Sequence, residues 1–167
     1  MSMHKLYILF FVLVVSWSSC INAPDFDDTP ALEFVSMSKS TMIQDELGRD
    51  SIILQLRYTD GDGNVGVQDG DPAKNVIVRD SRFNEIYAQF STPIIPQQGA
   101  NNGIDVDLTL LILNDCCLYP PEDSIPACSQ TSRYPTNEFF FTVTIEDQDG
   151  NISNEVQTDM VTLQCIR

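Results

Sequence analysis

Residues 51–59 read SIILQLRYT, and this stretch decides the class of fold. Every second position from Ile52 to Tyr58 is large and apolar, whereas polar side chains alternate with them from Gln55 onward. Successive side chains of a β-strand point to opposite faces, so the pattern predicts a strand with one buried and one solvated face. Such a strand needs a second apolar layer to cover it.

Further stretches along the chain show the same β pattern, and convincing helical periodicity is missing. About seven short strands predict an all-β fold, an antiparallel β-sandwich. The most economical topology is immunoglobulin-like or fibronectin type III-like, with a jelly roll or a partly open barrel as alternatives. The other predicted strands are residues 31–38, 75–80, 85–90 and 104–113, followed by a hairpin of residues 138–146 and 155–164.

The N-terminus has the order of an export signal. His4 and Lys5 precede an apolar run over residues 6–15, which is too short to span a bilayer, and small residues follow it. Ser18-Ser19-Cys20 resembles a bacterial lipobox, although Trp17 stands where such motifs usually carry an aliphatic residue. We therefore expect residues 1–19 to be a cleaved signal peptide and Cys20 to be lipidated, with a plainly secreted protein as the alternative.

The residues that follow Cys20 predict a tether. Residues 22–28 are polar, acidic and contain a proline, so they cannot build a core of their own. They also resemble the acidic surface-export signal of lipoproteins from the Bacteroidota, and a simple flexible linker is the alternative. The predicted organisation is a signal peptide (1–19), a tether (20–30) and one immunoglobulin-like domain (31–167).

Composition excludes several functions for the mature chain. The formal charge is −15, and −16 without residues 1–19, which hold one lysine and no acidic residue. A chain this acidic repels nucleic acid, so we expect no nucleic-acid partner. The single histidine, His4, and the single tryptophan, Trp17, both lie in the predicted signal peptide. Histidine-based catalysis is then excluded, and we expect the protein not to be an enzyme.

Four cysteines remain beside Cys20. An even number in an exported chain favours disulfides, with three pairings open. A four-thiolate zinc site is the rival, but two adjacent cysteines lack the spacing with which one turn presents two ligands. We expect one disulfide to close the loop 116–128 and another to tie the last cysteine back to it. The four are Cys116, Cys117, Cys128 and Cys165.

Two loops share the pattern D-x-D-G-N directly after a predicted strand, at residues 60–64 and 147–151. Oxygens at alternate positions of a tight turn can hold a hard cation such as Ca²⁺, although Asp-Gly and Gly-Asn are also ordinary turn residues. In the sandwich topology both loops lie at one end, where clustered carboxylates repel one another unless a cation neutralises them. The sequence therefore predicts a structural Ca²⁺ site formed by Asp60, Asp62, Asn64, Asp71, Asp147 and Asp149.

The stretches YTDGDGNVG (58–66) and VTIEDQDGNISN (143–154) resemble uncharacterised surface lipoproteins of the Bacteroidota. The resemblance implies an immunoglobulin-like fold and an outer-membrane location, lipid-anchored and surface-exposed, with a periplasm-facing or secreted protein as alternatives. It transfers no catalytic residue. We expect a non-catalytic binding or accessory module that contacts a partner protein in the envelope; the alternative is a glycan-binding lipoprotein that assists an outer-membrane transporter through Tyr87, Tyr119 or Tyr134.

Two weaker signals complete the sequence analysis. Asp123-Ser124-Ile125 resembles the O-glycosylation site of the same phylum, so Ser124 is a candidate for modification. A carboxylate-based hydrolase using Asp60 with Asp62, or Asp105 with Asp107, is a third function, disfavoured because neighbouring acidic residues are usually just solvated.

Overall fold

The computed structural model describes residues 25–96 and 103–166. Their regular structure is almost entirely β, and these residues form no helix long and apolar enough to cross a bilayer. The predicted signal peptide and Cys20 lie outside the described residues. In chain order the elements are β1 (Ala31–Met37), β2 (Thr41–Ile43), β3 (Ser51–Asp60), β4 (Val76–Asp80), β5 (Glu85–Phe90), β6 (Ile104–Leu113), the 3₁₀ turn η1 (Pro121–Asp123), β7 (Thr136–Phe139), β8 (Phe141–Ile145), β9 (Val156–Gln157) and β10 (Val161–Gln164).

Strand β3 is the centre of a three-stranded antiparallel sheet with the order β1-β3-β6. In the β3–β6 register Ile52 lies opposite Ile112, and Leu56 lies opposite Leu108. Because both strands alternate with period two, this register places their apolar sets on one face. The four inward side chains of β3, from Ile52 to Tyr58, are at most 1% exposed.

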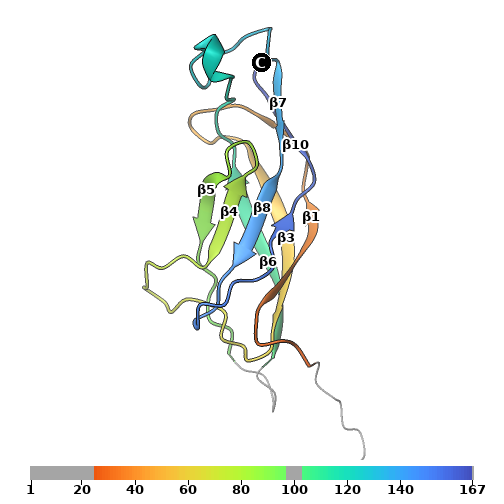
Figure 1. The fold of residues 1–167 in the computed structure, drawn as a ribbon, viewed down its shortest axis with the longest axis vertical. Coiled ribbons are helices and arrows are strands. Elements are labelled where there is room, and N and C mark those ends of the chain that lie inside the picture. Colours follow the sequence, from red (N-terminus) through yellow and green to blue (C-terminus); the bar gives the residue numbers. More distant parts are fainter. Residues whose placement is uncertain (1–24, 97–102, 167) are drawn as a thin grey trace, which may run out of the picture.

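A four-stranded antiparallel sheet with the order β5-β4-β8-β9 covers that face. Val76 and Val78 of β4 lie opposite Ile145 and Val143 of β8, and all four are buried. Figure 1 shows this sheet lying across β3 and β6, and the buried side chains of both sheets form one core cluster. The predicted all-β fold with antiparallel sheets is confirmed, and the arrangement is consistent with a sandwich.

The predicted C-terminal hairpin is confirmed as an antiparallel pairing, β7 with β10 and β8 with β9, but each of its strands is divided between two sheets. At Phe140 the chain leaves the ladder: its N–H donates to Ser81 Oγ (3.0 Å), and its carbonyl accepts from the Ser81 N–H (3.1 Å). Strand β8 stays in the four-stranded sheet, whereas β7 pairs with β10 in a small sheet with the order β2-β10-β7. Strand β2, which lies parallel to β10, was not predicted.

The cysteines form two disulfides, Cys116–Cys128 and Cys117–Cys165, in agreement with the predicted arrangement. Cys117 and Cys165 are fully buried and belong to the core, so this pair ties β10 to the segment after β6. Between residues 118 and 138 no residue is fully buried, although the partly buried Tyr119 packs against the core. We call residues 118–138 the stapled segment.

The first described residues lie against the loop that follows β3. The Gly61 N–H donates to the Asp27 carbonyl (2.7 Å), and a Cβ at Gly61 would lie only 2.4 Å from the Phe26 carbonyl oxygen. Glycine is therefore required there for the two backbones to approach each other. The end of the predicted tether is seated on the domain through this contact.

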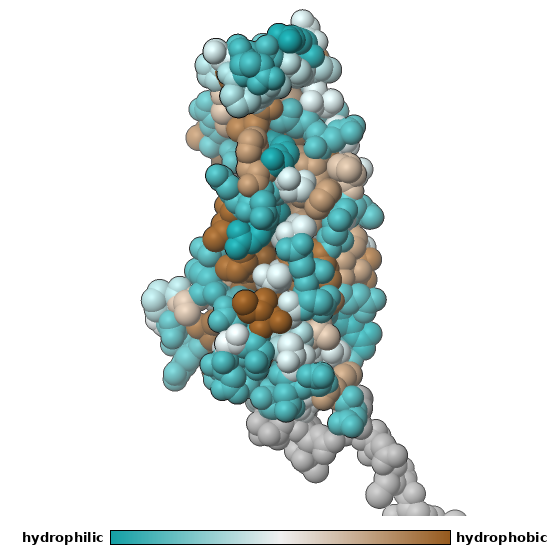
Figure 2. Space-filling view, in the orientation of Figure 1, coloured by the Kyte–Doolittle hydropathy of each residue, from teal (hydrophilic) through white to brown (hydrophobic). Residues whose placement is uncertain are grey.

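The two ends of the molecule differ in construction. Figure 1 shows the stapled segment at one end, and the loops after β3 and β8 at the other, where the described chain begins. On the face drawn in Figure 2, hydrophobic side chains lie mainly over the middle of the molecule, and both ends are mainly hydrophilic.

Candidate functional site

The two acidic loops predicted from the sequence meet at one end of the fold. The Gln148 N–H donates to the Asn64 carbonyl (3.3 Å), and Asn64 Nδ2 donates to Asp149 Oδ2 (3.0 Å). Val65 and Asp147 form an isolated antiparallel bridge between the loops. The loop after β3 and the loop after β8 therefore form a single unit, held by backbone and side-chain contacts.

The loop 60–64 wraps its own polar groups around its interior. The Asn64 N–H donates to Asp60 Oδ2 (2.9 Å), and Asn64 Nδ2 donates to Asp62 Oδ2 (2.9 Å). Gly63 has a φ of 70°, a left-handed conformation that glycine adopts without strain. Asp60 is 0% exposed, although it ends a strand in a surface loop. Since burial penalises the charged form of a carboxyl group, Asp60 is unusual in this position.

The loop 147–151 has a different internal arrangement, with Asp147 as its organising residue. Asp147 Oδ1 accepts from the N–H groups of Asp149 (2.9 Å) and Asn151 (2.7 Å), and its Oδ2 accepts from Asn151 Nδ2 (2.7 Å). Both carboxylate oxygens are thus used in closing the turn, as aspartate often does. Asp147 contributes negative charge to the site but has local donors for its oxygens.

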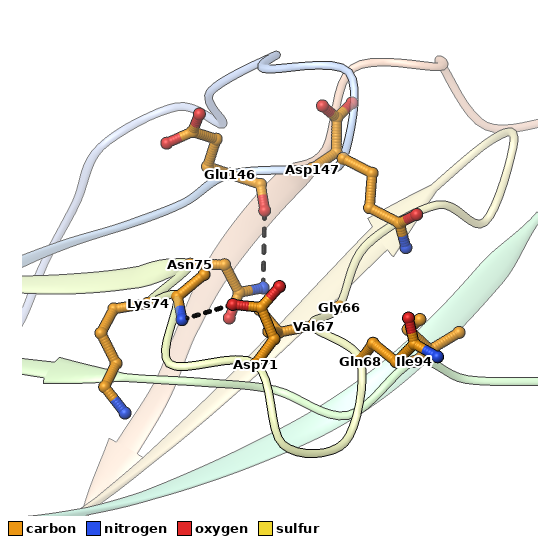
Figure 3. A pocket seen from close by; sticks show the side chains of 11 residues that line it. Gly66, Val67, Gln68, Asp71, Lys74, Asn75, Ile94, Glu146 and Asp147 are labelled. Carbon is orange, nitrogen blue, oxygen red and sulfur yellow. Dashed lines mark hydrogen bonds between the residues drawn. The ribbon is translucent and has the colours of Figure 1, made fainter.

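Asp71 lies apart from the other predicted ligands. Its Oδ1 accepts from the Ala73 N–H (2.9 Å), which closes a local turn. It lines an open pocket of about 400 Å³ together with residues of both loops. Figure 3 shows the Asp71 carboxylate beside Asn75, whereas the Asp147 carboxylate points away from the pocket. Asp71 and Asp147 therefore do not face each other across a common ion in this arrangement.

Burial and neighbouring charge change the acidity of Asp60. Burial, followed by the nearby Asp62 carboxylate and, more weakly, Asp147, raises the pKa of Asp60 to about 6. The Asn64 N–H bond lowers the pKa in part. Burial, and after it the negative charge of Asp60, also raises the pKa of Tyr58 to about 12. Among the carboxyl groups of these two loops, Asp60 is therefore the one that most needs a positively charged partner.

This pKa predicts how metal-free protein responds to pH. An unfolded aspartate titrates near 3.9, so the folded state holds this proton more tightly than the unfolded state does. The contribution of Asp60 to the free energy of unfolding should therefore fall as pH rises from about 4 to about 6, and stay low above that. Urea unfolding in metal-free buffer at several pH values measures it. The loss of unfolding free energy between pH 4 and pH 6 should be absent in Asp60→Asn. If the unfolding free energies of the two proteins changed with pH in parallel, this prediction would be contradicted.

In the described ranges the carboxylates of the acidic loops do not come as close together as one group of ligand atoms at the opposite end of the fold does. Oxygen and sulfur atoms of Glu46, Cys116 and Cys128 lie within 4.8 Å of one another. The two sulfur atoms are joined in a disulfide and are not thiolates, which are the form that binds metal. These atoms therefore lie close together because of the disulfide, and we do not interpret them as a metal site.

The stapled segment holds itself together by polar contacts. Tyr134 Oη donates to Asp123 Oδ2, and Arg133 Nη1 donates to Asp123 Oδ1 (2.7 Å). Tyr119 Oη donates to the Ser129 carbonyl, and its ring lies 5.8 Å from that of Tyr134. The candidate modification site Ser124 is exposed at the end of η1. The segment is thus a preformed projection with an accessible serine.

The alternative acidic pair on β6 is solvent-facing. The Arg57 Nε donates to Asp105 Oδ1 (2.6 Å), and this guanidinium holds the pKa of Asp105 below its usual range. Asp107 is exposed on the same face. An acid–base pair needs one carboxyl group with a raised pKa, and Asp105 is shifted in the opposite direction.

Some contacts of the site were beyond sequence reasoning. The contact of Gly61 with residues 26 and 27 has no local pattern, and the closure of the second loop by Asn151 is only hinted at by its Asp-Gly-Asn sequence. Comparison of the chain with models of known protein families, with characterised proteins and with solved structures finds no match.

Proposed function

We propose that this protein is a non-catalytic binding module of the cell envelope, with an immunoglobulin-like sandwich anchored to the outer membrane through a lipid on Cys20 and exposed at the surface. Its role is to hold a partner protein. The observation that carries this proposal is the position of the stapled segment: it projects at the end of the molecule opposite the first described residues (Figure 1). A module tethered at one end presents the other end to its surroundings.

The construction of the stapled segment also supports a recognition role. It has no buried residue, and the disulfide at Cys128 with a set of internal hydrogen bonds fixes its shape. A prearranged loop loses little conformational entropy on binding, which is why rigid scaffolds commonly recognise partners through such loops. The non-catalytic assignment is supported by Asp60, whose full burial keeps a substrate from its carboxylate.

The tyrosines lend little support to the glycan-binding alternative. A sugar platform needs an exposed aromatic face. Tyr87 packs edge-on against Phe141 (5.0 Å between ring centres) and its hydroxyl donates to the Leu113 carbonyl (2.8 Å). Tyr119 and Tyr134 lie against each other and donate to acceptors of their own segment. A protein partner is therefore the function that we propose.

Site-specific photo-crosslinking in native cells tests the proposal. A photoreactive residue at Glu122 or Ser132, both exposed in the stapled segment, should give one discrete crosslinked protein. The matched control is Asp159, exposed in the connection between β9 and β10. We expect crosslinking from Glu122 and Ser132 to exceed that from Asp159 at least fivefold. Equal yields at all three positions would contradict recognition by this segment, and a Cys20→Ala variant that stays membrane-bound would contradict the anchor.

A further inference from the structure

Two buried oxygen atoms in the acidic loop have no hydrogen-bond partner. Among the described residues, the buried side-chain nitrogen and oxygen atoms without one are Asp60 Oδ1 and Asn64 Oδ1. They belong to a single turn and are four positions apart. Buried polar atoms are nearly always paired in folded proteins, so two orphans in one turn indicate a missing partner. Both atoms are acceptors, and the partner must therefore be a donor or a cation.

The surrounding donors are already engaged. The Asn64 side-chain NH₂ group lies between two carboxylates, donating to Asp62 Oδ2 (2.9 Å) and Asp149 Oδ2 (3.0 Å). This orientation turns the amide oxygen of Asn64 away from them and leaves it buried and without a donor. The Asn64 N–H in turn donates to Asp60 Oδ2 (2.9 Å) and to Asp62 Oδ1 (3.3 Å), and not to Asp60 Oδ1. The hydrogen bonds of the loop thus leave one oxygen of Asp60 and one of Asn64 for another ligand.

Basic side chains do not supply the missing charge within the described part of the chain. The ion pairs there join lysine or arginine to Asp45, Asp50, Asp80, Asp105 and Asp123. None of them involves the acidic loops. Asp60 is 0% exposed, and the Asp62 and Asp147 charges lie close by, so at neutral pH a bound cation would neutralise it.

We propose that a Ca²⁺ ion binds inside the loop 60–64, with Asp60 Oδ1 and Asn64 Oδ1 as ligands. The carboxylate of Asp62, which accepts from Asn64 on both oxygens (3.3 and 2.9 Å), adds negative charge beside them. These residues occupy alternate positions of the turn, and every ligand is an oxygen atom. Carboxylate and amide oxygens select hard cations over Zn²⁺, which prefers nitrogen and sulfur. Ca²⁺ accepts six to eight oxygens in flexible geometry, whereas Mg²⁺ demands a near-ideal octahedron and releases water reluctantly. A compact, preformed and partly dry turn fits Ca²⁺ better.

The ligand set is smaller than the sequence predicts, and the structure explains the difference. Asp147 uses both oxygens to close its own turn, and Asp149 accepts from the Asn64 amide and so orients a ligand without being one. Asp71 closes a turn in another part of the loop. The ion would stabilise a junction of three segments, since Asn64 contacts residues 148 and 149 and Gly61 contacts Asp27. This inference is independent of the proposed partner binding.

Calcium titration of the full-length protein in detergent tests the site. After removal of divalent ions with a chelator, 5 mM Ca²⁺ should raise the melting temperature by about 5–10 °C, as a ligand that binds the folded state at many times its Kd does. The same concentration of Mg²⁺ should give less than half of this shift. An unchanged melting temperature in Ca²⁺ would overturn the proposal, and an equal response to Mg²⁺ would overturn the assignment to calcium.

Matched variants place the ion. Asp60→Asn should keep the fold in chelator, with a melting temperature at or above that of wild type because it removes a buried charge, yet lose at least tenfold in Ca²⁺ affinity. Asp71→Asn removes a charge from the neighbouring turn and should bind as wild type does. If Asp60→Asn bound Ca²⁺ as tightly as wild type, or Asp71→Asn lost as much affinity, the ligand set would be wrong.

Terbium luminescence reports whether the bound ion lies close to a tyrosine. Tb³⁺ replaces Ca²⁺ at oxygen sites, and it emits when a nearby tyrosine is excited. Tyr58 lies two residues before Asp60, and the Asp60 charge contributes to the raised pKa of its hydroxyl. We expect Tb³⁺ emission from wild type, displaced by Ca²⁺, and a loss of most emission in Tyr58→Phe with the Ca²⁺-induced stabilisation retained. Undiminished emission in Tyr58→Phe would overturn the placement of the ion beside Tyr58.

Discussion

Arg82→Met should destabilise the protein by on the order of 3 kcal/mol, because it leaves the charge of Asp80 buried without its partner. Arg82 Nε contacts both carboxylate oxygens of Asp80 (3.1 and 2.9 Å), and Asp80 is 6% exposed. The guanidinium also lies 4.1 Å above the Phe139 ring, and it donates to Asn137 Oδ1 (2.9 Å). The substitution therefore removes a charge pair, a ring contact and the link from the β4–β5 turn to β7. Urea unfolding measures the loss.

Strand β4 offers a control next to the same turn. Arg79 is partly exposed and makes one long hydrogen bond, to the Asn84 carbonyl (3.3 Å), so Arg79→Met should cost less than about 0.5 kcal/mol. The double variant Asp80→Asn/Arg82→Met should recover more than half of the loss, since no unpaired charge is left behind. If the two methionine variants had the same stability, Arg82 would not be the partner that neutralises Asp80.

The second large effect is expected from removal of the buried disulfide. Cys117–Cys165 closes a loop with a sequence separation of 48, against 12 for Cys116–Cys128. The loop-entropy relation gives about 4 kcal/mol for the longer loop and about 3 kcal/mol for the shorter one. Cys117→Ala/Cys165→Ala also empties space in the core, so it should cost at least about 1 kcal/mol more than Cys116→Ala/Cys128→Ala.

Hydrogen exchange shows which part of the molecule each disulfide stabilises. Without Cys117–Cys165, amides of β2 and β10 should lose protection together, because the bond holds β10 where β2 pairs with it. Without Cys116–Cys128, faster exchange should be confined to the stapled segment. Loss of protection in β2 and β10 of the variant without Cys116–Cys128 would contradict this division. Full protection of these strands in the variant without Cys117–Cys165 would contradict it as well.

The architecture was predictable where the residues carry a local pattern. Strands β3 and β6 carry an apolar side chain at every second position, and the structure begins and ends them within one residue of the prediction. The pattern fails at residues 139–141, which are three phenylalanines in a row and so carry no period of two. The chain changes sheets there through a contact with Ser81, a residue far away in sequence. Strand β2 has three residues and no period, and it exists because β10 pairs with it.

The acidic site was predictable in part for the same reason. The spacing of Asp60, Asp62 and Asn64 is local, and the sequence contains it completely. Which oxygen remains without a partner depends on the orientation of the Asn64 amide, and Asp149 from another loop sets that orientation. Asp71 is an aspartate like the others, but the turn that it closes lies elsewhere. Composition and spacing therefore identify candidates, and tertiary contacts select among them.

The pairing of β2 with β10 has a consequence for the order of folding if the chain is exported as we propose. Gln44, just after β2, donates through its side chain to the Cys165 carbonyl, 121 positions later, and accepts from the Cys117 N–H (3.1 Å). Three cysteines, from 116 to 128, leave the exporting channel well before the fourth. Until Cys165 arrives, Cys117 lacks its native partner but has two neighbours with which it can exchange. We therefore expect oxidation of this chain to require an isomerase, and its folding to be completed only after residue 165 has crossed the membrane.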